Sequence, residues 1–202
     1  MNSPTHSFLA LALLSKSGDT KRNWAVFIGA LIPDAAVYVW FIWQIFIKGE
    51  NQRRIWRELY FEPPMQLFIA PFNSIPLFAA IALLGWWQRG RLFGKALLFF
   101  ALAALIHIAT DFPVHNHDAY RHFWPFSDWR FISPLSYYEA AHHAHWVAPI
   151  EMLIALWAIY ILRKRFSVRW GHIVLNIFAC LYVLGFILAL LNLILAVGHA
   201  FS

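Results

Sequence analysis

Long apolar stretches alternate with short polar segments along this chain, and this pattern predicts membrane-spanning helices. A helix needs about 20 mainly apolar residues to cross the hydrocarbon of a bilayer. Five stretches approach that length, namely Trp24–Ile47, Met65–Trp87, Leu92–Thr110, Trp146–Leu162 and His172–Gly198. Because backbone groups inside a bilayer must hydrogen-bond within the protein, we expect all five stretches to be helical.

The first apolar stretch, Thr5–Leu14, is too short to cross a bilayer by itself. We expect it to form a partial helix beside the first span, followed by a turn at Ser15–Asp19. No internal repeat or low-complexity tract interrupts the pattern. Residues 1–202 are therefore predicted to form a single all-α domain, an integral membrane bundle of about five transmembrane helices with a short N-terminal partial helix.

The composition agrees with a membrane protein, since 61% of the residues are hydrophobic and only 13% are charged. Soluble domains carry about 25% charged residues. The net charge of +6 comes from basic residues in short loops rather than from a stripe or tail, which argues against a nucleic-acid partner. The expected partners are membrane lipids and other membrane proteins. The single cysteine, Cys180, excludes both a disulfide framework within the chain and a cysteine-based zinc site.

The distribution of basic residues predicts an orientation. Ten fall on one side of the predicted spans, namely Lys16, Lys21, Arg22, Arg89, Arg91, Lys95, Arg163, Lys164, Arg165 and Arg169. Six fall on the other side, namely Lys48, Arg53, Arg54, Arg57, Arg121 and Arg130. Because cytoplasmic loops carry the excess of Lys and Arg, we expect the N-terminus to be cytoplasmic. The expected location is the inner membrane of a bacterium.

Ionisable residues within the apolar segments share a similar depth. Measured from the basic loops at ~1.5 Å per residue, Asp34, His107 and Glu151 lie at roughly 18 Å. By the same rise His6 lies at roughly 15 Å and Asp111 at roughly 24 Å. Burying a charge in hydrocarbon costs ~2.5–3.5 kcal/mol, so such residues usually face an interior site. The shared depth predicts that these side chains converge.

His107 and Asp111 stand four residues apart, which places them on one face of a helix. The loop that follows holds six of the ten histidines, namely His115, His117, His122, His142, His143 and His145. Imidazole and carboxylate are the ligands of hydrolytic zinc sites, and they also suit manganese and iron. The pattern therefore indicates a metal centre to which His115 or His117 could contribute.

Simpler explanations exist for each residue. Asp34 follows Pro33 and could cap a kinked helix, and His107 could be an interior histidine with satisfied hydrogen bonds. Glu151 could be a ligand, a proton relay or a structural partner. The loop histidines His122, His143 and His145 are more typical of a membrane interface than of a metal site.

Four short motifs resemble those of a known family. They are Thr5-His6, Gly29-Ala30-Leu31-Ile32-Pro33-Asp34, His107-Ile108-Ala109-Thr110-Asp111 and Phe123-Trp124-Pro125-Phe126-Ser127. Between residue 5 and about residue 130 the chain resembles the YdjM-like family of membrane-bound metal-dependent hydrolases. It is more distantly similar to zinc-dependent phospholipase C.

The resemblance implies a set of metal ligands, namely His6, Asp34, His107 and Asp111. It also implies that Asp111 could bridge two ions. The family usually has a histidine in the second span where this chain has Asn73, and an amide is a weaker zinc ligand than imidazole. That substitution raises the alternative of a degenerate site.

Together these features predict a membrane-bound hydrolase that uses a divalent metal, with zinc expected and manganese or iron as alternatives. Its substrate would be a lipid or lipid-linked phosphoester near the membrane boundary, with Glu151 or His115 as general acid or base and His117 as a further ligand. The main alternative is a non-catalytic membrane subunit of a larger complex that keeps the hydrolase fold. A proton or ion transporter with a relay through Asp34 and Glu151 is a third possibility.

Overall fold

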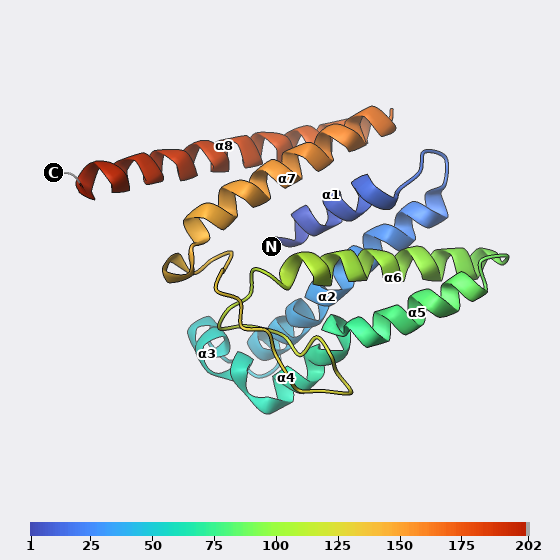
Figure 1. Cartoon of the computed structure of the whole chain (residues 1–202), viewed down its shortest axis with the longest axis horizontal. Coiled ribbons are helices and arrows are strands. Elements are labelled where there is room, and N and C mark those ends of the chain that lie inside the picture. Colours follow the sequence, from blue (N-terminus) through green and yellow to red (C-terminus); the bar gives the residue numbers. More distant parts are fainter. Residues whose placement is uncertain (201–202) are drawn as a thin grey trace.

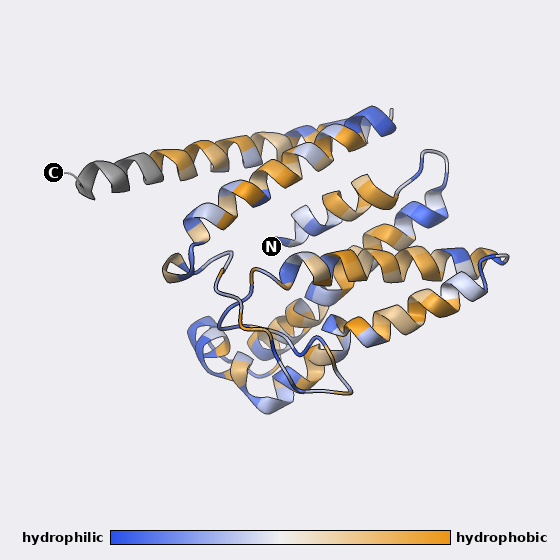
Figure 2. Ribbon diagram, in the orientation of Figure 1, coloured by the Kyte–Doolittle hydropathy of each residue, from blue (hydrophilic) through white to orange (hydrophobic). Residues whose placement is uncertain are grey.

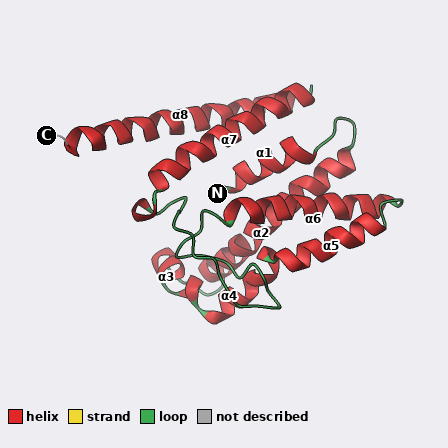
Figure 3. Ribbon diagram, in the orientation of Figure 1, coloured by secondary structure: helices red, strands yellow, loops and turns green. Residues whose placement is uncertain are grey.

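The computed structural model describes the backbone of residues 1–200 and the side chains of residues 1–191. The described residues form helices and loops without strands, which confirms the all-α prediction (Figure 3). Five helical segments are long and apolar enough to cross a membrane, so the chain is a membrane protein. They are α2 (Thr20–Phe46), the segment Pro63–Trp87, α6 (Leu92–Asp111), α7 (Ala144–Arg165) and the part Arg169–Leu191 of α8 (Arg169–Ala200). Figure 2 shows that hydrophobic residues dominate these segments.

The short helix α1 (Ser3–Leu14) lies in the interior of the bundle (Figure 1). It packs against α2 and α6 on one side and against α7 on the other. Helix α6 in turn packs against both α2 and α5 (Ile75–Trp87), whereas α8 packs against α7. The predicted partial helix is thus confirmed, and its contacts place residues near the N-terminus at the centre of the molecule.

The second predicted span is not one continuous helix. It consists of α4 (Pro63–Ile69), a 3-10 turn at Ala70–Asn73, and α5. Pro71 and Pro76 have no backbone N–H to donate, so an uninterrupted helix would lose hydrogen bonds there. The side chain of Ser74 accepts a hydrogen bond from the backbone N–H of Leu77 and starts α5 afresh. The sequence predicts a helical span over Met65–Trp87 with kinks at Pro71 and Pro76; the span is present, and the chain breaks there into two helices.

The two ends of the bundle differ in character. The short connections at residues 15–19, 88–91 and 166–168 lie together at one end (Figure 1). The opposite end holds α3 (Gln52–Arg57), the 3-10 turns Leu59–Phe61 and Ala140–His142, and the long loop that follows α6. The two groups of basic loop residues therefore lie at opposite ends, as the hydropathy pattern predicts.

Helices α2 and α6 approach each other very closely at Gly29. A Cβ atom at this position would lie 2.1 Å from the carbonyl oxygen of Phe100. Small residues permit such backbone contact between membrane helices. The close approach allows His107 of α6 to reach the carbonyl oxygen of Ala30 on α2, at 2.7 Å.

Candidate metal centre

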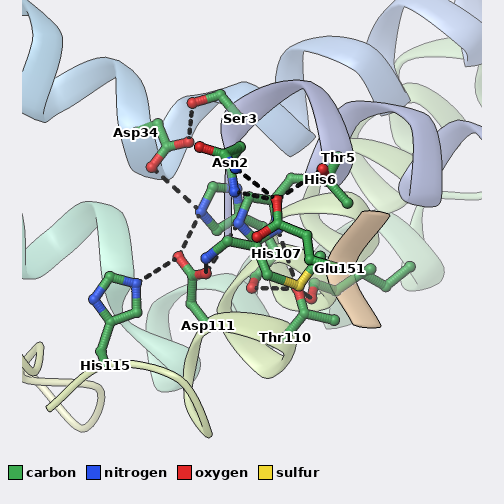
Figure 4. Close-up of polar contacts among 12 residues, drawn as sticks. Asn2, Ser3, Thr5, His6, Asp34, His107, Thr110, Asp111, His115 and Glu151 are labelled. Carbon is green, nitrogen blue, oxygen red and sulfur yellow. Dashed lines mark hydrogen bonds and ion pairs between the residues drawn. The ribbon is translucent and has the colours of Figure 1, made fainter. Parts of the chain in front are cut away.

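The carboxylate of Asp111, at the C-terminal end of α6, is surrounded by three imidazole rings (Figure 4). The Nε2 atom of His6 lies 2.9 Å from Asp111 Oδ1. The Nε2 atoms of His107 and His115 lie 3.1 Å and 3.4 Å from Asp111 Oδ2. All four side chains are buried, and they come from α1, α6 and the loop after α6.

Two of these rings have their Nδ1 atoms hydrogen-bonded to oxygen acceptors. His107 Nδ1 lies 2.7 Å from the carbonyl oxygen of Ala30, and His115 Nδ1 lies 2.7 Å from Asp118 Oδ2. A carbonyl or carboxylate oxygen can only accept a hydrogen bond, so each Nδ1 carries a proton and donates it. Such partners are typical of metal-ligating histidines, because they fix the tautomer and the ring orientation.

The ring of His6 is held in a similar way. Its Nδ1 atom lies 3.1 Å from the hydroxyl of Thr110. That hydroxyl donates to backbone carbonyls one turn earlier in α6, including Ile106 at 2.9 Å, and so acts as acceptor for His6. The ring also stacks on His107 with 3.6 Å between ring centroids. The Nε2 atom of His6 is therefore directed towards Asp111.

This arrangement concentrates electron-rich atoms at one point. If the three rings were neutral with their protons on Nδ1, three Nε2 lone pairs would face one carboxylate. The Nε2 atoms of His6 and His115 are buried, and neither has a hydrogen-bond partner in the described part of the chain. Buried polar atoms normally have partners, so the centre requires positive charge, from protons or from a cation. One cation is present, because the α-ammonium group of Met1 lies 2.5 Å from Asp111 Oδ1.

One ligand atom each from His6, His107 and Asp111 lies within 4.8 Å of the other two, close enough to share a metal ion. Asp34 lies at the edge of this group. Its Oδ1 atom is 3.6 Å from His107 Nε2, and its Oδ2 atom accepts a hydrogen bond from Ser3. The predicted convergence of His6, Asp34, His107 and Asp111 is confirmed, whereas their roles as ligands stay a prediction.

Electrostatics at the loop side of the centre favour positive charge. Burial opposes protonation of His115, but the carboxylates of Asp111 and Asp118 outweigh it and raise the pKa of His115 to about 9. Positive charge is therefore favoured at the His115 imidazole.

Glu151, predicted as a catalytic acid or base, lies on α7 and holds the start of α1. Its Oε1 atom accepts hydrogen bonds from the backbone N–H and side-chain amide of Asn2, at 2.7 Å and 2.9 Å, and from Thr5 Oγ1 at 2.9 Å. These contacts fix the first turn of α1, on which His6 lies. The geometry favours a positioning role for Glu151.

The structure does not bring His117 into the group. His117 is exposed, and its ring packs edge-on against Phe61 with 4.5 Å between ring centroids.

Asn73 is buried just before α5, where its backbone carbonyl oxygen lies 3.2 Å from His122 Nδ1. His122 is likewise buried within the protein. Sequence reasoning missed Asp118, although the spacing His115-x-x-Asp118 was a usable signal for a histidine–carboxylate pair.

A cavity of about 370 Å³ opens beside the centre. Asp34 and Asp118 line it, as do residues 1–3 and a group of aromatic side chains from α2, α3 and the loops at that end. Its size falls in the range of small-molecule sites. A ligand in this cavity would therefore lie next to the carboxylates that border the metal centre.

Comparisons with known proteins identify no relative of this chain. No family model, no curated protein and no solved structure matches it. The relation to YdjM-like hydrolases consequently rests on the short motifs and remains a proposal.

Proposed function

We propose that this protein is a membrane-bound, metal-dependent hydrolase. His6, His107 and Asp111 would hold a divalent cation, with Asp34 and His115 as additional ligands. The observation that carries this proposal is the set of three buried Nε2 atoms aimed at one carboxylate, each ring being held through its Nδ1 atom. A metal ion would satisfy all of these atoms at once.

The donor set favours zinc, with manganese and iron as alternatives. Imidazole nitrogen and carboxylate oxygen suit all three ions. A divalent cation would supply Lewis acidity, lowering the pKa of water and polarising the scissile group.

The substrate would bind in the cavity beside the candidate metal centre. The cavity lies beside Asp34, which is 17% exposed and is the least buried carboxylate at the centre. If Asp34 does not ligate the cation, its carboxylate can accept a proton from a reacting water molecule. The cavity also lies at the end of the bundle where the spans give way to loops, so a lipid headgroup could enter it while its acyl chains remain among the helices. A lipid or lipid-linked phosphoester is the proposed substrate class.

A structural role for the same centre is the alternative, as in a non-catalytic membrane subunit. The contact between the Met1 ammonium and Asp111 favours it, because that cation already neutralises part of the charge. In that case the chain would need no metal.

Metal analysis separates the two. The protein is purified in an uncharged detergent without chelators, supplemented with zinc, manganese or iron, and analysed by mass spectrometry. We expect at least one ion per chain, lost in His6→Ala and Asp111→Asn but retained in His145→Ala, which alters an exposed histidine in the first turn of α7. Thermal unfolding reports whether each variant is folded. A folded parent that binds no metal after supplementation would refute the hydrolase proposal.

A further inference from the structure

The cavity beside the metal centre has walls of a particular chemistry. Seven of its thirteen lining residues are aromatic, and two are the aspartates Asp34 and Asp118. The residues that line it include no lysine or arginine side chain, and the α-ammonium of Met1 is already paired with Asp111. An anionic group would thus meet no lysine or arginine among the described residues that line the cavity.

The aromatic rings form connected pairs. Trp56 stands 5.8 Å from Tyr60 between ring centroids, and Tyr137 stands 5.0 Å from Tyr138. Trp56 is also stacked on Phe41, at 5.2 Å, which limits its movement. Aromatic faces attract cations electrostatically, and groups of such rings are the usual means of recognising quaternary ammonium ions.

One wall carboxylate has unused capacity. Asp118 Oδ2 accepts from His115, whereas Asp118 Oδ1 is buried and has no hydrogen-bond partner in the described part of the chain. A buried acceptor of this kind is normally satisfied. A positively charged ligand in the cavity would be attracted by the negative charge of this carboxylate and would face the aromatic rings at the same time.

We propose that this cavity binds the positively charged ammonium group of a lipid headgroup. The inference rests on the proposed function, since it names the substrate class of the same site: a phosphoester whose alcohol carries an amine or a quaternary ammonium group. The ammonium group contacts Trp56 and Asp118, and the phosphoester lies towards Asp34 and the metal centre.

Binding of choline tests the inference without phosphate or turnover. Choline and its uncharged isostere 3,3-dimethyl-1-butanol have nearly the same shape and differ in charge. Each is titrated against the protein in an uncharged detergent, with binding followed by ligand-observed NMR. We expect choline to bind about tenfold more tightly than the isostere, because only the cation gains from the rings and the carboxylate. Equal affinities would overturn the inference.

Trp56→Leu should abolish the preference, whereas Trp170→Leu, at a 75% exposed residue of α8 outside the cavity, should preserve it. If Trp56→Leu does not fold, Tyr138→Leu serves instead, because Tyr138 is exposed at the cavity edge. An unchanged preference in the folded cavity variant would also overturn the inference.

Metal content is measured in the same samples, which distinguishes the two proposals. Bound metal without a preference for choline would leave the hydrolase proposal standing and refute the headgroup assignment. A preference for choline in a protein that binds no metal would support the headgroup assignment and refute the hydrolase proposal.

Discussion

Asp118 accepts a hydrogen bond from His115 and so would influence the candidate metal centre without supplying a ligand to it. We predict that Asp118→Asn lowers the affinity for the proposed metal by about 10- to 100-fold, as changes to such supporting partners commonly do. The amide oxygen of Asn can still accept the hydrogen bond from His115 Nδ1, but the substitution removes the negative charge of Asp118. Affinity is measured by competition with a chromophoric chelator. Asp128→Asn is the control, since the Asp128 side chain is 79% exposed and pairs with Arg121. Equal affinities in the two variants would contradict the role of Asp118.

At this scale, depth along a helix was the informative signal. It brought together His6, Asp34, His107 and Asp111, because the rise per residue is constant in helices. A constant rise per residue applies only within a helix, so it gives no depth for residues in the loop after α6. The sequence therefore does not distinguish His115 from His117 as a ligand. Their separation depends on how the loop folds: His115 turns to Asp111 and Asp118, whereas His117 packs on Phe61.

The contact between α2 and α6 depends on a residue without a side chain. We predict that Gly29→Ala destabilises the protein by about 1–3 kcal/mol, the usual cost of overpacking, because its Cβ atom would collide with the backbone of Phe100. Separating the helices would also draw Ala30 away from His107 and reduce metal binding. Thermal unfolding in detergent and metal content are the measurements.

Gly90→Ala is the matched control, because a Cβ atom at Gly90 would meet nothing within 4 Å. It should leave both the melting temperature and the metal content unchanged. A Gly29→Ala protein that melts with the parent would show that the helices can separate without loss, and would remove this explanation for the glycine in the Gly29–Asp34 motif.

The sequence predicts the ends of a helix where the hydropathy changes, as at α6. It does not predict the break within the second span. There the hydropathy stays high across Pro63–Trp87, although the backbone breaks at residues 70–74. Proline and the capping serine decide the break, and they leave the hydropathy almost unaltered. The prolines indicated a kink, but whether the chain bends or restarts depends on packing against α2 and on the loop that contacts Ser74.

Helix α1 lies between α2, α6 and α7, and the sequence predicted only one of these neighbours. A short apolar helix that is buried on nearly all sides, with Thr5, His6 and Ser7 among its buried residues, needs neighbours in several directions. The sequence suggested the first span as neighbour, whereas the structure adds α6 and α7. Only the tertiary arrangement shows that Glu151, from a helix far along the chain, anchors the turn that carries His6.

The orientation of the whole molecule in the membrane gives the last prediction. The connections at residues 15–19, 88–91 and 166–168 carry or adjoin the larger group of basic residues, and we propose that this end is cytoplasmic. In a background with Cys180→Ser, Gly90→Cys and Ser127→Cys each place one thiol at an exposed position at opposite ends. A membrane-impermeant maleimide should label Ser127→Cys in intact bacterial cells and Gly90→Cys only after permeabilisation.

The candidate metal centre and its cavity lie at the end that holds residue 127, so this result would direct the search for a substrate to lipids of the outward-facing leaflet. The opposite labelling pattern would direct it to lipids of the cytoplasmic leaflet and contradict the proposed orientation.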